Sequence, residues 1–282
     1  MSEEVFHVVS TDYTLRAKRR RFILESKNRK RELHTNKVKC LVLNPHGHVS
    51  SAVLELAADS EILILVVDDR GGISMMEPCK PQRDVKYLLA QIEALLYRRE
   101  EFSRIFEEAA LVEISNSLRN LGFELSFESR NLRGAEEEYM KILTELFGDE
   151  ITKLVEAGRA RLVAECIYFL WRAGLEPSLG FLHEGPASLA RDLSLEFRYN
   201  IVDALAIEEM REGPGTLFSL MTRYEKKMRE EFVPYPHLKK LVPLRDVIKR
   251  QAMTLAASFT STHVRYMPYS LFRLQEKHAR EI

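Results

Sequence analysis

Three residues of one short stretch could bind a divalent metal ion together: His183, Asp192 and Glu196. A histidine combined with carboxylates is a ligand set that suits Mn²⁺, or Mg²⁺ that keeps several of its waters. Asp192 and Glu196 lie four residues apart, so we expect them to share one face of a helix, where their charges repel. A cation would remove this repulsion, and so would Arg191 or Arg198. The residue types alone therefore leave a metal site and a screened polar patch as alternatives.

An amphipathic helix must position the two acids. A preceding helix is expected to end at Gly174, and the next to begin near 186–188, directly after His183, with Pro186 in its first turn. The pattern predicts that this helix continues to residue 212. Its buried stripe consists of apolar residues spaced four apart, namely Leu189, Leu193, Phe197 and Ile201.

Two other groups of residues have a possible metal chemistry. Glu136 to Glu138 are three acids at the start of another predicted helix, where the positive end of the helix dipole favours them. Taken alone, Glu136 is therefore a helix-start acid. His46 and His48 fall on the same side of an extended segment and could chelate a metal, but no partner ligands follow nearby. This favours a polar loop between a strand and a helix.

The most unevenly charged segment is 16–31, where the only acid is Glu25. It is interpreted either as a solvated hairpin or as a surface that contacts phosphates, because dense positive charge repels itself unless an anion relieves it. Contacts of the second kind would be sensitive to salt and independent of base sequence. The basic residues are Arg16, Lys18, Arg19, Arg20, Arg21, Lys27, Arg29, Lys30 and Arg31.

Composition sets wider limits on the class of protein. Lysine and arginine number 42 and aspartate and glutamate 42, so bulk charge gives no reason to expect nucleic acid. Cys40, Cys79 and Cys166 have no metal-type spacing, which is typical of reduced thiols in a cytoplasmic protein. Apolar runs such as "CIYFLW" are far shorter than the roughly 20 residues of a membrane span. We therefore expect a soluble protein of the cytoplasm with no membrane partner.

The sequence pattern changes from strand-like to helical along the chain. Short β-branched runs separated by turns fill the first 80 residues, and "DDRGG" at 68–72 reads as a hairpin turn. The polar, proline-containing stretch 77–84 follows, and beyond it helical periodicity continues with no recurring strand pattern. The predicted fold class is α+β, with a small β-rich domain at 1–80 and a larger all-α domain at 84–282.

Several motifs in this order resemble one protein family. They are "LRGAE", "AGLEPSLGFLHEG", "SLARDLSLEFR" and "IVD", preceded by "VSSAVLELAADSEILILVVDDRGG" and followed by "RDVIKRQAMTLAASFTSTHVRYMPY". Together they resemble the CRISPR-associated endonuclease and integrase of spacer acquisition, the Cas-one family. The resemblance extends over nearly the whole chain, and "GLEPSLGFLH" and "LRGAE" are its most specific parts.

The resemblance implies a β-domain that forms a homodimer and a helical domain that holds Mn²⁺ or Mg²⁺. Carried over to this chain, the family's ligands are Glu136 and His183, and its helix aspartate is Asp192. The family usually has an acid three residues further on, where this chain has Leu195. Glu196 or Asp192 itself would then have to supply the third ligand. A second departure is "VEAGR", where the family has "LNYGY" after a longer basic loop.

The implied function is insertion of short DNA into a CRISPR array, together with the Cas-two protein, by attack of a 3′-hydroxyl on a phosphodiester. Phosphates would be contacted by the basic segment 16–31 and by Arg245, Lys249 and Arg250 of the last helices. Because of Leu195, the alternative is a degenerate relative that binds DNA or a partner without catalysis. A third interpretation is an unrelated helical enzyme with a small-molecule pocket near His183.

Overall fold

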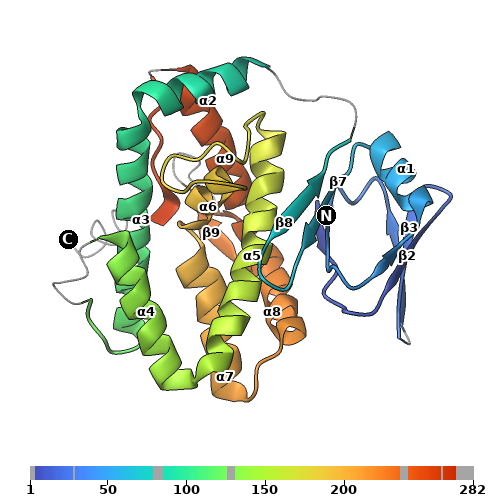
Figure 1. Ribbon diagram of the computed structural model, residues 1–282, viewed down its shortest axis with the longest axis horizontal. Coiled ribbons are helices and arrows are strands. Elements are labelled where there is room, and N and C mark those ends of the chain that lie inside the picture. Colours follow the sequence, from blue (N-terminus) through green and yellow to red (C-terminus); the bar gives the residue numbers. More distant parts are fainter. Residues whose placement is uncertain are drawn as a thin grey trace. The chain divides into compact units, whose positions relative to one another are not determined.

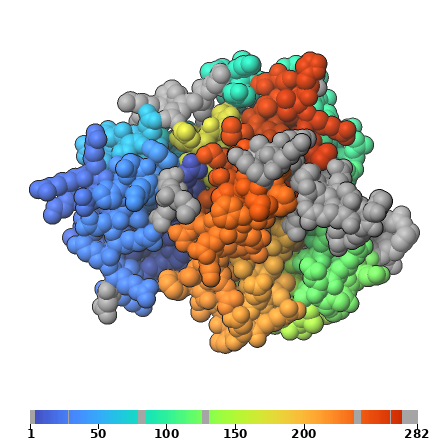
Figure 2. Space-filling view, turned by 180° about the vertical axis from the view of Figure 1, so that it is seen from behind, coloured from blue at the N-terminus to red at the C-terminus, as the bar shows by residue number. Residues whose placement is uncertain are grey.

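Figure 1 shows the computed structural model of the chain, which describes residues 4–27, 29–78, 85–125, 131–235, 241–261 and 263–270. The chain divides into two compact units, Met1–Gln82 and Arg83–Ile282. Most of the stretch expected to link two domains, 77–84, lies outside the described residues. Figure 2 gives the surface of the chain from behind.

The described part of the N-terminal unit contains two four-stranded sheets, with strand orders β1-β5-β7-β8 and β4-β3-β2-β6. Strands β5 and β7 are almost entirely buried and pair in parallel, as expected for continuous apolar runs. The elements are β1 (Val5–His7), β2 (Thr14–Lys18), β3 (Arg21–Ser26), β4 (Arg29–His34), β5 (Cys40–Leu43), β6 (His48–Val49), α1 (Ser51–Asp59), β7 (Leu63–Val67) and β8 (Ile73–Met76).

The turn expected at "DDRGG" is confirmed between β7 and β8, which are antiparallel. The backbone N–H of Asp68 donates to the carbonyl of Gly72 at 2.9 Å. The Asp68 carboxylate in turn accepts from the N–H groups of Arg70 and Gly72, at 2.8 and 2.7 Å. The short polar side chain thus satisfies the donors of the turn, which is the role aspartate commonly has in turns.

Helices dominate the described part of the C-terminal unit. They are α2 (Val85–Tyr97), α3 (Arg99–Asn120), α4 (Leu132–Phe147), α5 (Asp149–Arg172), α6 (Ser188–Ser194), the π-helix η1 (Arg198–Asp203), α7 (Ala204–Glu212), α8 (Leu217–Glu230) and α9 (Leu244–Thr260). Figure 1 shows α5 running through the middle of this unit, where it contacts α4, α6, η1, α7, α8 and α9. This position explains why α5 is apolar on nearly all sides in its second half.

Two expectations for this unit are wrong. The helix predicted through 187–212 is divided, because α6 ends at Ser194 and the chain then passes through a turn and η1 before α7 begins. Strands also occur here, since β9 (Phe232–Pro234) pairs with β10 (Leu241–Pro243) in a two-stranded ribbon. These strands are too short to show a periodic pattern in the sequence. The mixed α+β class is confirmed.

Among the described residues, no helix is both long enough and apolar enough to cross a bilayer.

Candidate functional site

The side chain of Asp192 organises the loop that carries His183. Its Oδ2 accepts the backbone N–H groups of Phe181 and Leu182, at 2.7 and 3.1 Å. Its Oδ1 accepts the backbone N–H of His183 at 2.9 Å and lies 2.7 Å from His183 Nδ1. Asp192 is fully buried, and its contact with Phe181 is buried as well, whereas the contacts with Leu182 and His183 are partly buried. The arrangement fixes the ring of His183 and leaves Nε2 as the nitrogen that can bind a ligand.

Close packing of the loop against the start of α6 holds this geometry. A side chain at Gly180 would place its Cβ 2.6 Å from the backbone carbon of Ser188, so only glycine fits. The Gly180 N–H donates to the Ser188 hydroxyl at 2.8 Å, and the Leu189 N–H donates to the Pro177 carbonyl at 2.9 Å. The backbone of the motif "EPSLGFLH" therefore holds His183 in one position relative to α6.

Glu136 lies in the first turns of α4, where Asn131 caps the helix by accepting the Gly134 N–H at 2.9 Å. The Glu136 carboxylate is 30% exposed. It accepts a hydrogen bond from the Tyr199 hydroxyl at 2.6 Å and forms an ion pair with Arg198. Glu136 thus has both solvent access and a cationic neighbour, and its partners come from η1.

The residues behind Glu136 form a rigid polar group. Burial raises the pKa of Tyr199, so its hydroxyl stays protonated and donates to Glu136. The Tyr199 ring meets that of Tyr139 edge-on, with centroids 5.4 Å apart. Arg159 lies over the Tyr199 ring and pairs with the fully buried Asp203, with Nε 2.9 Å from Oδ1. The sequence did not indicate that Tyr199 and Arg159 support the site. Asp203 is part of the motif "IVD", but the sequence assigned it no function.

Glu196 faces a different part of the unit. Its Oε2 accepts from the Gln251 side chain and from the Tyr269 backbone N–H, both at 2.7 Å, and its Oε1 accepts from the Tyr266 hydroxyl. Burial raises its pKa to about 7, and these hydrogen bonds oppose the rise. Glu196 therefore attaches the segment 266–269 to α9.

The expectation that Asp192 and Glu196 share a helix face is wrong, because α6 ends at Ser194 and each carboxylate has its own partners. Neither arginine screens the pair, since Arg198 pairs with Glu136 and Arg191 is exposed. The two acids are separated by the turn that follows Ser194. The sequence gives no sign of this turn, because apolar residues continue through it with helical spacing.

Taken together, the four residues expected at a metal site lie in three settings. Within the described ranges, no three of Glu136, His183, Asp192 and Glu196 have ligand atoms within 4.8 Å of one another. Glu136 and His183 both have solvent access, as an ion with remaining waters would need, and His183 has the carboxylate support typical of a metal ligand. The oxygens of Asp192 and Glu196 are already engaged, and Leu195 is fully buried. Of the four, Glu136 and His183 are thus the two whose side chains keep solvent access.

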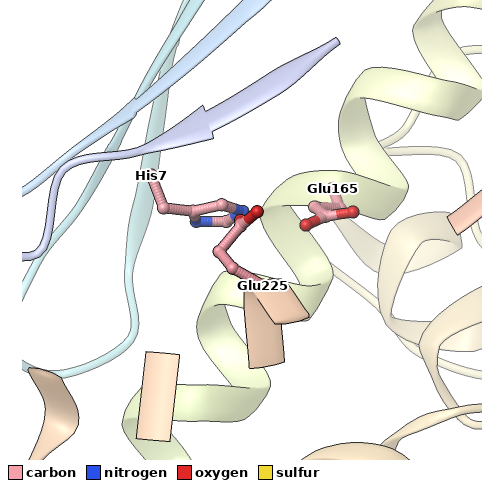
Figure 3. Close-up of side chains that lie close together, drawn as sticks. All are labelled: His7, Glu165 and Glu225. Atoms are coloured by element: carbon pink, nitrogen blue, oxygen red, sulfur yellow. The ribbon is translucent and has the colours of Figure 1, made fainter. Parts of the chain in front are cut away.

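Arg245 has no access to phosphate, which corrects the expectation for this residue. It is a buried residue of α9, and its guanidinium lies 2.8 and 3.0 Å from Glu165 of α5 and 3.0 Å from Glu225 of α8. Figure 3 draws these two glutamates, together with His7 of the N-terminal unit. Breaking a buried pair of this kind leaves an uncompensated charge, so Arg245 serves stability.

The other two basic residues expected on α9 are partly buried. The guanidinium of Arg250 lies over the Tyr235 ring, 5.6 Å from its centroid, and Lys249 is likewise only partly exposed. A cation stacked on an aromatic face keeps its charge and its outward N–H groups. Lys249 and Arg250 thus remain accessible to some degree, unlike Arg245.

The nine basic residues of segment 16–31, here called the basic hairpin surface, lie on β2, β3, β4 and their turns, and all nine are exposed. Among them, Arg21 pairs with Glu32 at 2.7 Å and Lys30 pairs with Glu25 at 3.3 Å. The hairpin expected from the sequence is confirmed, with a third strand added.

Three basic residues in the turns of this surface have positive φ, a backbone conformation that usually contains glycine or asparagine. Arg19 and Arg20 form the two-residue turn between β2 and β3, with φ of 48° and 58°. Lys27 begins the turn between β3 and β4 with φ of 45°. Two-residue hairpin turns with positive φ at both positions strongly favour Asn-Gly. The strained arginines therefore project positive charge from the tip at a cost in stability.

Comparison with known proteins agrees with this architecture. The CRISPR-associated endonuclease Cas1 1 of Francisella tularensis subsp. novicida (strain U112) is 28% identical over 169 residues, which are 57% of this chain and 49% of that protein. The chain thus spans about half the length of this curated relative. A casposase bound to integration product has a similar fold, with a TM-score of 0.72, 15% identity and coverage of 95% of this chain and 93% of the other.

A Cas6-RT-Cas1–Cas2 complex contains a chain of similar fold, with a TM-score of 0.75 and 12% identity over 95% of this chain and 36% of the other. The family described as CRISPR associated protein Cas1 matches residues 6–147 and 124–216. These matches contain the β-rich unit and the elements that carry Glu136, His183, Asp192 and Arg198. The chain therefore belongs to the Cas1 family of CRISPR associated proteins.

Proposed function

We propose that this chain processes DNA in CRISPR adaptation, as an endonuclease and integrase. The support is family membership, the relative named as an endonuclease and the likeness in fold to a casposase bound to integration product. The observation that carries the proposal is the held imidazole: Asp192 takes three backbone N–H groups and His183 Nδ1, so that Nε2 is presented in one direction.

Glu136 and His183 would hold the metal ion, Mn²⁺ or Mg²⁺. Such an ion polarises a phosphoryl oxygen and offsets the charge that develops on the leaving oxygen. Asp192 would orient His183 without binding the ion, and Tyr199 and Arg198 would fix the Glu136 carboxylate. In the reaction, the 3′-oxygen of the incoming strand forms a bond to phosphorus, and the bond to the 3′-oxygen of the repeat strand breaks. The attacking hydroxyl would lose its proton to solvent or a base, and the released 3′-oxygen would take one up from solvent.

A second candidate function is DNA or partner binding with impaired catalysis. Two observations favour it. Leu195 is buried at the position where the resemblance to the family implies an acid. The carboxylate oxygens of Glu196 accept hydrogen bonds from Gln251, Tyr266 and Tyr269. An ion with only two protein ligands keeps more waters and binds more weakly. The two functions differ in turnover and not in DNA affinity, so they can be separated.

The DNA surface that we propose consists of the basic hairpin surface, with lesser contributions from Lys249 and Arg250. Its cations project from exposed strands and turns, which suits contacts to the phosphate backbone and gives no base reading. We further propose that the β-rich unit forms a homodimer and that Cas2 is a partner, as in the complex of similar fold that contains Cas1 and Cas2.

The deciding experiment is strand transfer and its reversal on branched DNA in the presence of Mn²⁺, with His183→Ala beside the wild type. The integrase proposal expects turnover by the wild type and a fall of about a hundredfold or more in the variant, because the metal loses a ligand. Equal and negligible turnover in both proteins, with DNA affinity retained, would establish the binding function. Absence of both turnover and DNA affinity would contradict both proposals.

A further inference from the structure

A cavity of about 490 Å³ lies in the C-terminal unit and is lined by the end of α3, by η1 and by α7. Its volume falls in the range of roughly 300–1,000 Å³ that is typical of small-molecule sites. Of the described residues that line it, only Tyr199 belongs to the candidate site, where its hydroxyl donates to Glu136. The cavity thus borders the candidate site but contains neither Glu136 nor His183.

The buried part of the lining offers polar atoms that the protein leaves without partners. Asn200 Oδ1 and the hydroxyl of Ser270 are buried, and neither has a hydrogen-bond partner among the described residues. Ser270 is only 1% exposed. Buried polar atoms are normally satisfied by water or by a ligand, because leaving them unpaired is costly. The buried carboxylate of Glu113 also lines the cavity. The acceptor oxygens of Glu113 and Asn200 favour a ligand that carries N–H groups.

The exposed part of the lining carries positive charge. Arg119 of α3 and Arg211 of α7 are both exposed, and neither forms an ion pair within the part of the chain that the structure describes. Glu208 is exposed beside them, so one positive charge remains in excess. Guanidinium groups bind phosphate through two parallel hydrogen bonds, which makes this rim suited to a phosphate group.

Apolar side chains from two elements complete the lining. Leu121 follows the last turn of α3, and Ala204 and Ile207 lie in the first turns of α7. Flat heteroaromatic bases bind between side chains of this kind, while polar groups bond to their edges. A base with N–H donors and an attached phosphate therefore matches all three kinds of lining residue. A free amino acid would match the charges but would leave the apolar side chains unused.

We propose that this cavity binds one nucleotide whose base carries an exocyclic amino group. The edge of the base faces Glu113, Asn200 and Ser270, and the phosphate lies at Arg119 and Arg211. The nucleotide is either free in solution or the last one of a single DNA strand, since both present the same base and phosphate. Adenine, cytosine and guanine have such an amino group, and thymine has none. The inference does not depend on the metal site or on catalysis.

The first test is calorimetric titration of the full chain with dAMP, dCMP, dGMP and dTMP, in the absence of divalent ions and at up to about 1 mM nucleotide. At least one of the first three should bind saturably. The nucleotide dTMP should bind about tenfold or more weakly, because it leaves a buried acceptor unpaired. Absence of saturable binding would overturn the inference, and so would equal affinity for all four or for inorganic phosphate alone.

Substitutions at the rim test the location of the phosphate. Arg119→Gln/Arg211→Gln should weaken binding about tenfold or more, because the phosphate loses both charged donors. Arg104→Gln/Arg229→Gln removes two other exposed charges, on α3 and α8, and is the matched control. Its affinity should equal that of the wild type. Equal weakening in both double variants would show a bulk effect of charge and would overturn the assignment to this cavity.

A substitution inside the cavity tests the location of the base. Ala204→Leu would extend a side chain into the space without removing a polar group, and it should abolish nucleotide binding. Thermal unfolding checks that the variant keeps its fold. Unchanged affinity in a folded Ala204→Leu would place the bound nucleotide elsewhere and would overturn the inference.

A short single strand that ends in the preferred base separates the two sources of the nucleotide. If the cavity takes the end of a strand, Ala204→Leu should weaken binding of this oligonucleotide about tenfold, and the mononucleotide should compete with it. If the cavity takes only free nucleotides, the oligonucleotide should bind the wild type and Ala204→Leu equally, without competition. Either result supports a nucleotide site, provided that the mononucleotide titrations succeed.

Discussion

His183 Nδ1 lies 2.7 Å from Oδ1 of Asp192, and the same carboxylate also accepts the backbone N–H of His183. The aspartate thus fixes both the ring and the backbone of one residue. A change at Asp192 should therefore affect metal binding without removing a ligand.

Asp192→Asn should lower Mn²⁺ affinity about 10- to 100-fold, which is the usual effect of losing the group that orients a metal-binding histidine. The free energy of unfolding should fall by about 1–3 kcal/mol, because one of the buried donors loses its acceptor. Calorimetric titration with Mn²⁺ and denaturant unfolding measure the two effects. Asp149→Asn, an exposed aspartate of α5, is the control. Unchanged Mn²⁺ affinity in Asp192→Asn would show that His183 does not bind the ion.

Leu195→Glu tests whether position 195 faces the metal. Without a divalent ion, a carboxylate at this buried position should lower the free energy of unfolding by about 2–5 kcal/mol. Mn²⁺ should restore part of this loss if Glu136 and His183 lie within reach. Leu195→Gln has nearly the same shape without the charge and should respond much less to Mn²⁺. Thermal unfolding with and without the ion distinguishes them, and equal responses would place residue 195 away from the ion.

Glu196 should make stability depend on pH. Its pKa is raised from 4.5 to about 7 in the folded chain, so between these values the folded state binds more protons than the unfolded state. The free energy of unfolding should therefore fall as pH rises from 4.5 to 7, by up to about 3 kcal/mol, and level off above 7. Glu196→Gln should remove this slope, whereas Glu230→Gln, an exposed control on α8, should keep it. A slope that persists in Glu196→Gln would assign it to another group.

Changing the turn Arg19–Arg20 to Asn-Gly separates stability from DNA binding. The change suits the positive φ values and should raise the free energy of unfolding by about 1 kcal/mol. Removing two cations should lower the slope of log affinity against log salt by about 2 for duplex DNA. Fluorescence anisotropy over a salt series measures this slope. A more stable protein with an unchanged slope would show that the tip does not contact phosphate.

Local sequence patterns predicted the helices and strands, but they did not predict the long-range contacts that form the site. The β-rich and helical parts, the hairpin turn at 68–72 and the helix ends near Gly174 and Ser188 were all readable, because glycine, proline and apolar spacing act locally. The role of Asp192 was not, since its acceptor bonds go to a loop nine to eleven residues earlier.

The same limit applies to the buried charges. Arg245 and Glu165 are 80 positions apart and meet only because α5 and α9 pack together. A sequence shows neither that an arginine is buried nor which acid compensates it, so Arg245 looked like any other solvated cation. Glu196 was misplaced for a related reason, because its partners lie in α9 and in the segment that follows it.

The π-helix η1 ties two parts of the site to one short segment. It carries Arg198 and Tyr199, which hold Glu136, and Asp203, which pairs with Arg159. Backbone hydrogen bonds in a π-helix join residues five apart, so its turn is wider than that of an α-helix. Loss of one residue here would rotate the side chains before it relative to those after it by about 100°. The length of this segment is therefore constrained as strictly as its residue types.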